Sequence, residues 1–578
     1  MKISRGYCRT FLLAFFLLYG AFGSAWSQNL PPEVISYADM VLYNGKILTA
    51  DPNFTVVEAV AIRDGKFLAV GSRDKILAMA GPKTHKVDLR GRSVVPGFID
   101  THLHSAFVGN NGFDALETGE RDRADWSTLE TALAWIKRQV DKKKPGEVVS
   151  LSGPSSKVFV NELNVEVLDK ISPNNPLLLE AGNDQVVANS LLLKMMPLNI
   201  PGVLKDKNGK PTGQLRGGAA GIPVWDFEPW PPVESLLEPQ KKYFLSTNAQ
   251  GLTTIMGRAK GLAISVFRDL MVKNELTARV RIIHELVRQN PFPEPYLKRV
   301  GNLTDFGNDM LKIIGTTTQV VDGSTGTGSA YTSFTKIGPD EQDPYTLFGQ
   351  NKWAETEDLA NSDKKNILMA NRYGWTILGM HSSGDMSTAT LLDVYEEAHR
   401  ERPLTGRHFG IDHIEMLRPS DIPRFKALDV NPSVYSKAIG NNDNLIKMYG
   451  LDRVSTFQPV KSIIDGGVLP VAEADAGLSE SAPMLNIKRW VTRLDHKNRL
   501  INPKEKASRE QALYMYTLWA ARYSGEQNLI GSIEPGKLAD LVVLAGDYMT
   551  FPEQDLDKLR VLMTVVGGKV VHEVSGTF

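Results

Sequence analysis

Two histidines close the motif with the clearest chemical potential in this chain. The apolar run 96–99 is followed by Asp100, Thr101 and the pair His102 and His104. On a β-strand, side chains at i and i+2 point to one face, so both imidazoles can bind one ion. A His-x-His pair in a solvated loop is common, but its position directly after a strand-like run favours metal binding.

Three more side chains of ligand type follow strand-like runs, namely His381, His413 and Asp475. Taken singly, each histidine is typical of a partly buried imidazole, and Asp475 is typical of a helix N-cap. The repeated pattern of a strand followed by a ligand predicts instead one shared metal centre. Its candidate ligands are His102, His104, His381, His413 and Asp475. The other histidines lack this context and are interpreted as bystanders: His85, His284, His399, His408, His496 and His572.

A parallel α/β fold would bring these side chains together. From about Val94 to about Arg522, strand-like runs alternate with amphipathic stretches, which predicts a (β/α)8 barrel or a doubly wound sheet. The sequence has no Gly-rich phosphate loop of standard spacing, which weakens nucleotide binding. In a barrel, the carboxyl ends of the strands form the active site. The predicted strands cover 93–99, 148–152, 177–180, 252–256, 280–283, 375–380, 409–414 and 468–472, and the predicted helices cover 127–140, 388–400 and 510–521.

Both ends of the chain have the pattern of small β modules. Asn44-Gly45 and Asp64-Gly65 separate apolar runs, as in hairpins with type I′ turns, where both central residues need positive φ. The runs 539–544, 561–566 and 569–571 repeat this pattern, so we expect the two ends to pair into one β-sandwich. The expected divisions are a signal peptide (1–27), the first part of the sandwich (28–93), a metal-binding barrel (94–525) with an inserted subdomain at about 111–239, and the second part of the sandwich (526–578).

The first residues form a secretory signal. Basic residues precede the apolar run 11–22, and Ala25 and Ser27 place small residues before a cleavage site. The apolar run is shorter than the ~20 residues of a spanning helix. We therefore expect cleavage after Ser27, a periplasmic or secreted location, and no stable membrane anchor afterwards. The single cysteine, Cys8, lies in the removed segment, so any metal must be held by His, Asp or Glu.

The overall charge does not favour a polyanionic partner. Lys+Arg and Asp+Glu both total 66, so the formal net charge is zero. This balance gives no electrostatic reason to expect nucleic acid or an anionic membrane surface as partner. The composition, 42% hydrophobic and 23% charged, is ordinary for a globular protein and argues against a disordered or fibrous one.

The sequence resembles the amidohydrolase superfamily, and specifically its branch of YtcJ-like hydrolases, over nearly the whole mature chain. The resemblance implies a barrel with a composite β-sandwich, a divalent metal, and hydrolysis of carbon–nitrogen bonds other than peptide bonds in a small amide-like substrate. It also implies a homodimer. It matches His102 and His104 to the ligands of the first strand, His381 and His413 to the fifth and sixth strands, and Asp475 to the last strand. The matching segments are 44–47, 94–100, 211–213, 251–254, 322–324, 381–385 and 531–541.

Three positions depart from the family pattern. Thr318 stands where the family often has a lysine that can be carboxylated and bridge two metals, and Asp184 and Gly217 replace a frequent histidine and glutamate. Because a neutral threonine cannot bridge two ions, we predict one ion per chain. Zinc is favoured because it accepts both imidazole and carboxylate ligands, with iron or manganese as alternatives. The predicted ligands of this single ion are His102, His104, His381 and Asp475.

We expect a metal-activated water to attack the amide carbon, with Asp475 accepting its proton and returning it to the departing nitrogen. His413, which a single ion does not need as a ligand, would stabilise the oxyanion. Asp100 and Asp385 fit two roles equally well, orienting ligating histidines or capping at the surface. Two alternatives stay open: a hydrolytic deaminase of a ring substrate with the same centre, and a non-catalytic barrel that binds a ligand. Retention of all five ligand positions argues against the second, because buried unpaired His and Asp are costly.

Overall fold

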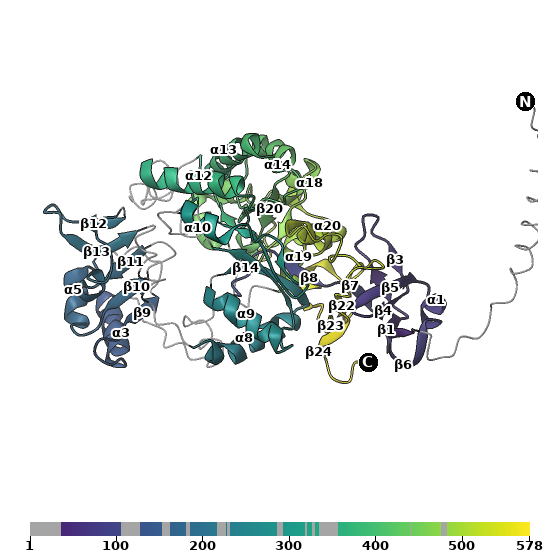
Figure 1. Cartoon of the computed structure of the whole chain (residues 1–578). Helices are drawn as coiled ribbons and strands as arrows, with labels where there is room; N and C mark the ends of the chain where they lie inside the picture. Colours follow the sequence, from purple (N-terminus) through teal and green to yellow (C-terminus); the bar gives the residue numbers. More distant parts are fainter. Residues whose placement is uncertain are drawn as a thin grey trace, which may run out of the picture.

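The computed structural model places three parts in a row (Figure 1): sheets from both ends of the chain, a central α/β domain, and a smaller sheet with its own helices. Among the described residues, no helix is both long enough and apolar enough to cross a bilayer. The predicted signal peptide lies outside the described residues. These are 36–105, 128–152, 162–180, 185–200, 202–216, 223, 227, 232–259, 261–285, 293–317, 321–325, 330–333, 357–440, 442–475 and 482–578.

Strands from the two ends of the chain share one sheet. β22 lies antiparallel to β7, with Val542 opposite Val95, and β7 lies parallel to β2. The order of this sheet is β24-β23-β22-β7-β2-β3, and a second sheet has the order β5-β4-β1-β6. One buried cluster joins both sheets through residues such as Leu42 and Val543. The bounds are β1 (Ala38–Tyr43), β2 (Lys46–Leu48), β3 (Val56–Val57), β4 (Ala59–Arg63), β5 (Lys66–Gly71), β6 (Ala80–Asp88), β7 (Ser93–Pro96), β22 (Leu541–Leu544), β23 (Val561–Val566) and β24 (Lys569–Glu573).

The two predicted hairpin turns of the first module differ. Asp64 and Gly65 have φ of 53° and 74° and join the antiparallel strands β4 and β5, as expected. The hairpin predicted at Asn44-Gly45 is wrong, because β1 and β2 belong to different sheets. A side chain at Gly45 would meet Leu89 Cδ1 at 2.4 Å, so glycine serves close packing where the chain crosses between the sheets.

The central domain holds two sets of parallel strands. One sheet has the order β16-β17-β15-β14-β8, in which only β16 is antiparallel to its neighbour, and the other has the order β18-β19-β20-β21. Leu378 N donates to Thr316 O at one junction of the two sheets, and Thr101 N donates to Ala472 O at the other, both at 3.0 Å. The bounds are β8 (Phe98–Asp100), β14 (Leu252–Ala259), β15 (Arg279–His284), β16 (Phe306–Gly307), β17 (Leu311–Thr316), β18 (Met380–His381), β19 (Gly410–Asp412), β20 (Asn431–Val434) and β21 (Val471–Ala472).

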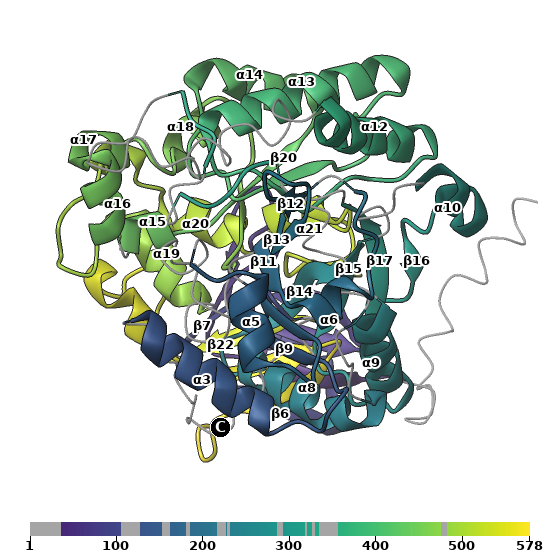
Figure 2. The same cartoon turned by 90° about the vertical axis from the view of Figure 1, so that its left-hand side faces the viewer.

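Helices alternate with these strands along the chain and surround them in the view of Figure 2. The predicted helix at 388–400 lies within α13, whereas the one predicted at 510–521 is divided into α20 and α21. The main helices of the domain are α8 (Val233–Asn248), α9 (Gly261–Val272), α10 (Pro293–Val300), α12 (Glu357–Arg372), α13 (Asp385–Glu401), α14 (Ile422–Leu428), α18 (Val460–Asp465), α19 (Pro483–Thr492), α20 (Arg509–Met515) and α21 (Leu518–Tyr523).

Besides the short antiparallel β16, two parallel strands of the central domain were not predicted, and one predicted strand is divided into two. β20 contains Pro432, which makes its short segment look unlike a strand. β17 starts with three partly exposed residues and lacks a sharp apolar run. The strand predicted at 93–99 breaks at Gly97, where a Cβ atom would meet Thr253 Oγ1 at 2.1 Å. β7 therefore enters the terminal sheet while β8 enters the central domain.

The third part is an insertion that follows β8. The predicted strands 148–152 and 177–180 lie here, in a sheet of order β12-β13-β11-β10-β9, and not in the central domain. The chain returns at α8, so the insertion replaces the connection after the first parallel strand, and it lies at the end of the domain opposite the terminal sheets (Figures 1 and 2). Its elements are α3 (Leu129–Asp141), β9 (Val149–Ser152), α5 (Val165–Ile171), β10 (Leu177–Glu180), β11 (Gln185–Ala188), α6 (Ser190–Leu193), β12 (Val203–Lys205) and β13 (Pro211–Arg216).

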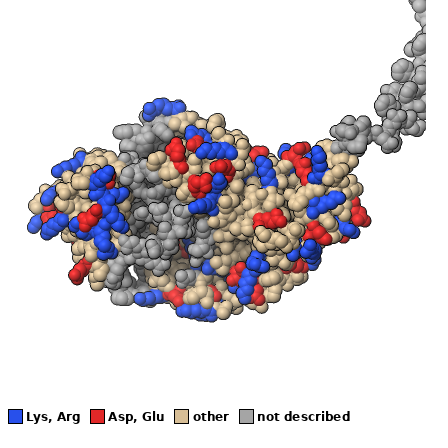
Figure 3. Space-filling model, turned by 90° about the horizontal axis from the view of Figure 1, so that it is seen from below, with Lys and Arg blue, Asp and Glu red and all other residues tan. Residues whose placement is uncertain are grey.

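Buried ion pairs connect the central strands to the segment that leads to β22. Arg279 lies 2.7 Å from Asp540, and Glu526 lies 2.5 Å from Arg281 and 2.7 Å from Lys312. On the surface, positive and negative side chains are interspersed on the face shown in Figure 3, as the balanced composition suggests.

Candidate metal centre

Three of the predicted ligands meet where the first and last parallel strands lie side by side. His102 and His104 follow β8, and Asp475 follows β21; Asp475 N donates to His102 O at 3.0 Å. Asp475 Oδ1 lies 2.7 Å from His104 Nε2 and 3.7 Å from His102 Nε2. The ligand atoms of these three residues all lie within 4.8 Å of one another. One oxygen and two imidazole nitrogens thus face a common point.

The two later histidines extend this group. The His413 ring centroid lies 4.7 Å from that of His102 and 4.5 Å from that of His381. His381 ends β18 and His413 follows β19, so all five predicted ligands lie at the carboxyl ends of parallel strands. The His381 ring contacts the His413 ring. Among the described residues, two groups of three have ligand atoms within 4.8 Å of one another, and His381 belongs to neither: His102, His104 and Asp475, and His102, Asp412 and His413.

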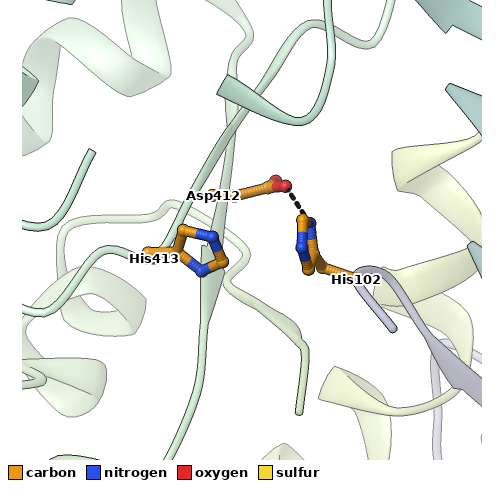
Figure 4. Close-up of side chains that lie close together, drawn as sticks. All are labelled: His102, Asp412 and His413. Carbon is orange, nitrogen blue, oxygen red and sulfur yellow. Dashed lines mark hydrogen bonds and ion pairs between the residues drawn. The ribbon is translucent and has the colours of Figure 1, made fainter. Parts of the chain in front are cut away.

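Asp412 is a member of the site that the sequence reasoning missed. Its Oδ2 lies 2.7 Å from His102 Nδ1 (Figure 4), and its Oδ1 accepts from Tyr523 Oη at 2.5 Å. Such a carboxylate holds the proton on Nδ1 and leaves the Nε2 lone pair of His102 for a metal. Strict alternation of side chains between the two faces of the predicted strand 409–414 placed His413 but not Asp412 in the site. His413 has φ of 64°, which breaks the alternation and lets both adjacent side chains face His102.

Glu473 was also missed, and it fixes the orientation of His413. Its Oε1 accepts from the backbone N of His413 at 3.0 Å and lies 2.6 Å from His413 Nδ1. Its Oε2 accepts from Ser433 Oγ at 2.6 Å. The proton of a neutral His413 therefore sits on Nδ1, and the Nε2 lone pair points away from Glu473.

Asp100 and Asp385, considered as residues that orient histidines, do not contact the histidine rings through the hydrogen bonds that the structure shows. Asp100 Oδ1 accepts from the backbone N atoms of His102 at 3.0 Å and Ala474 at 3.3 Å, so it joins the ligand-bearing segments and not the rings. Asp385 accepts from Ser333 N and Oγ at 2.9 and 2.5 Å. The carboxylate near His381 is Asp322, whose Oδ1 lies 3.4 Å from His381 Nδ1.

The charge states suit a divalent cation. Burial lowers the pKa of His102 well below its usual value, lowers the pKa of His381, and lowers the pKa of His413 to about 4. These imidazoles are therefore neutral, which is the form that binds metals. Burial alone would raise the pKa of Asp475, but the hydrogen bond with His104 and the Lys437 ammonium hold that pKa well below its usual range. Neutral imidazoles and a carboxylate form the donor set that zinc accepts.

Two cations border the centre. Lys437 Nζ donates to the backbone oxygen of Asp475 and lies 3.4 Å from its Oδ2. Arg258, from the end of β14, places Nη2 3.4 Å from His413 Nε2. Neither was singled out from the sequence, because a lone basic residue after a strand has no distinctive spacing.

Thr318, Asp184 and Gly217, the three departures from the family pattern, lie outside the described residues.

Residues 86–572 of the sequence match the amidohydrolase family. It is 25% identical to the N-substituted formamide deformylase of Arthrobacter pascens, over 93% of this chain and 99% of that protein. It is 24% identical to the putative amidohydrolase YtcJ of Bacillus subtilis, over 93% and 99%. Both alignments extend over nearly the full length of each protein.

Among solved structures, the fold is similar to that of an uncharacterized metal-dependent hydrolase from Pyrococcus furiosus. The two chains are 21% identical with a TM-score of 0.62, and the match covers 88% of this chain and 100% of that one. This likeness supports the fold, whereas the family match bears on the chemistry.

Proposed function

The chain belongs to the amidohydrolase family and is a metal-dependent hydrolase of carbon–nitrogen bonds, and we propose that it works with one divalent ion, held by His102, His104, His381 and Asp475. The observation that carries this proposal is the contact of His104 Nε2 with Asp475 Oδ1 at 2.7 Å, with His102 Nε2 at 3.7 Å from the same oxygen. Two segments 371 positions apart in the chain thus supply three metal-type donors to one point.

A single ion agrees with the charges around His413. The Arg258 guanidinium lies 3.4 Å from His413 Nε2, and a second cation at that nitrogen would be repelled by it. His102 Nε2 and His104 Nε2 instead lie 3.7 and 2.7 Å from the Asp475 carboxylate, which favours a cation. We favour zinc, with iron or manganese as alternatives that accept the same donors.

The residues of the site divide the work of hydrolysis. A bound divalent ion would act as a Lewis acid and would lower the pKa of water, so that hydroxide is available near neutral pH. Asp475, held by His104 and Lys437, accepts the proton of the attacking water and returns it to the departing nitrogen. Asp412 holds the His102 ring and Glu473 holds the His413 ring, so that the site is preorganised before the substrate arrives.

The substrate class proposed for first study is an amide of a small molecule. One relative, matched over nearly its whole length, is named an N-substituted formamide deformylase, so N-substituted formamides are the first compounds to test. The alternative function, a hydrolytic deaminase, predicts a different product, because a deaminase releases ammonia whereas a deformylase releases a substituted amine.

The finer architecture and the location belong to the same proposal. We infer that the parallel strands close into one (β/α)8 barrel, supported by the hydrogen bonds at both junctions of the two sheets. The terminal sheets would form a composite β-sandwich, supported by their shared buried cluster, and the division into 1–27, 28–93, 94–525 and 526–578 follows from it. Export after cleavage at Ser27 and the homodimer stay predictions, to be tested by N-terminal sequencing and light scattering.

The test of the function uses metal-replete enzyme and a panel of formamides, other amides, lactams and ring amines, with products identified by mass spectrometry. We expect release of a substituted amine, lost in a His104→Ala variant and kept in His85→Ala, which removes an exposed imidazole of β6. Hydrolysis that survives both His104→Ala and chelation would contradict the proposal. Ammonia as the product would favour the deaminase.

A further inference from the structure

Arg258 places a positive charge beside the metal-centre histidines, and the proposed mechanism gives it no catalytic part. It lies next to the carboxyl end of β14, and its Nη2 is 3.4 Å from His413 Nε2 and 4.0 Å from Asp412 Oδ2. Its side chain is only 15% exposed, and its Nε is buried without a hydrogen-bond partner among the described residues. The guanidinium is thus largely removed from water.

Among the described residues, Arg258 has no carboxylate that serves it alone. Asp412 is the nearest, but its two oxygens already serve His102 Nδ1 and Tyr523 Oη. A largely buried guanidinium whose Nε has no hydrogen-bond partner among the described residues is costly unless an anion completes its hydrogen bonds. Because the strand ends face the candidate metal centre, an anion formed there would meet these donors.

In its neutral form, His413 cannot donate a hydrogen bond from Nε2 to an anion formed at the centre. Its Nδ1 faces Glu473 Oε1 at 2.6 Å, and that oxygen also accepts the backbone N–H of His413. The ring proton is therefore on Nδ1, and Nε2 presents a lone pair toward Arg258. A lone pair repels an oxyanion, so His413 does not stabilise the oxyanion as first expected. The neighbouring group that can donate to it is the Arg258 guanidinium.

We propose that Arg258 is the catalytic residue that donates hydrogen bonds to the oxyanion of the tetrahedral intermediate. The inference rests on the proposed function. Water oxygen bonds to the carbonyl carbon, the carbonyl π electrons move onto the oxygen, and the water proton passes to Asp475. The carbonyl then re-forms as the C–N bond breaks, and the proton moves from Asp475 to the departing nitrogen. Arg258 keeps its protons throughout and stabilises the negative oxygen by charge-assisted hydrogen bonds.

Anion binding tests this role without a known substrate. Methylphosphonate, a tetrahedral anion, is titrated calorimetrically into metal-replete wild type, Arg258→Met, Arg258→Lys and the control Arg268→Met, whose side chain on α9 is 59% exposed. We expect binding about 10- to 100-fold weaker in Arg258→Met, intermediate in Arg258→Lys, and unchanged in the control. Metal content should be equal in all four proteins, because Arg258 is not a ligand.

Two results of the titration with wild type and the methionine variant would overturn the inference: no binding to wild type, or equal binding to wild type and Arg258→Met. Arg258→Lys keeps the buried charge, so it decides the matter if the methionine variant does not fold. Its binding must then fall between wild type and no binding, and a lysine variant as tight as wild type would contradict the role of the guanidinium.

Kinetics separate this role from substrate recognition. On an amide that the wild type hydrolyses, Arg258→Met should lower kcat about 10²- to 10³-fold with little change in KM. A raised KM with unchanged kcat would place Arg258 on a remote anionic group and overturn the inference. Wild-type protein that binds metal and methylphosphonate but hydrolyses no amide would contradict the proposed function instead, and the titration would still decide whether Arg258 binds an anion at the centre.

Discussion

Removing the Asp412 carboxylate should weaken metal binding without removing a proposed ligand. This side chain is fully buried, and its oxygens lie 2.7 Å from His102 Nδ1 and 2.5 Å from Tyr523 Oη. Carboxylates that orient a ligating histidine are typically worth 10- to 100-fold in metal affinity or activity, or about 1.4 to 2.8 kcal/mol. Asp412→Asn keeps an acceptor for His102 but loses the charge, so we expect about a tenfold rise in the metal Kd. Asp412→Ala loses both, so we expect about 100-fold.

The assay is competition for zinc against a chromophoric chelator, with circular dichroism to verify the fold of each variant. The alanine variant also leaves two buried donors unpaired, at about 1 to 3 kcal/mol each, so its metal Kd is measured below its unfolding transition. Asp385→Asn is the matched control, because this buried carboxylate binds Ser333 and no site histidine. It should change the Kd less than about twofold. If both Asp412 variants bind zinc as tightly as wild type, the assigned role of this carboxylate is refuted.

Three other substitutions test the general base, a buried ion pair and a tight backbone approach. Asp475→Asn should keep the fold and most of the metal but lower kcat about 10²- to 10⁴-fold, measured as amine release; full activity would refute its role. Glu526→Gln should lower the unfolding free energy by about 3 to 5 kcal/mol at pH 7, because it leaves Arg281 buried without a carboxylate. Burial alone would raise the pKa of Glu526, but Arg281 and Lys312 lower it, so this stabilisation should fade as pH falls below 4.5; urea unfolding at several pH values checks both. Gly97→Ala should cost about 1 to 3 kcal/mol by the same measurement, because its Cβ would lie 2.1 Å from Thr253 Oγ1.

The sequence located the centre because its ligands follow simple local patterns. His102 and His104 share a strand face by spacing alone, and the placement of Asp475 at the end of another apolar run is also local. The structure brings these three together. The pattern of a strand followed by a histidine also predicted His381 and His413, and the resemblance assigned them to the fifth and sixth strands. The structure places both rings in the same group.

The supporting residues could not be found in this way. Asp412 reaches the site only because His413 adopts φ of 64°, and neither spacing nor residue type reveals such a backbone. Glu473 and Arg258 matter through contacts with a histidine that is 60 and 155 positions away in the chain. Contacts of this kind depend on how the strands are arranged, which a single sequence does not state.

The fold shows the same limit. Asp64-Gly65 makes its hairpin because both flanking strands are neighbours in one sheet, whereas Asn44-Gly45, with the same local signal, carries the chain from one sheet to another. The presence of Pro432 in β20 likewise hid a central strand, because proline has no backbone donor and is unusual inside a sheet. Local chemistry predicts a turn or a strand, but the partner across the sheet decides its place.

The most direct test of the single-ion centre is the metal content of purified wild-type protein, determined by inductively coupled plasma mass spectrometry after removal of loosely bound ions. We predict one tightly bound divalent ion per chain, lost in His104→Ala. Two tightly bound ions per chain would contradict the single-ion centre, and a metal-free protein that still hydrolyses amides would contradict the metal centre altogether.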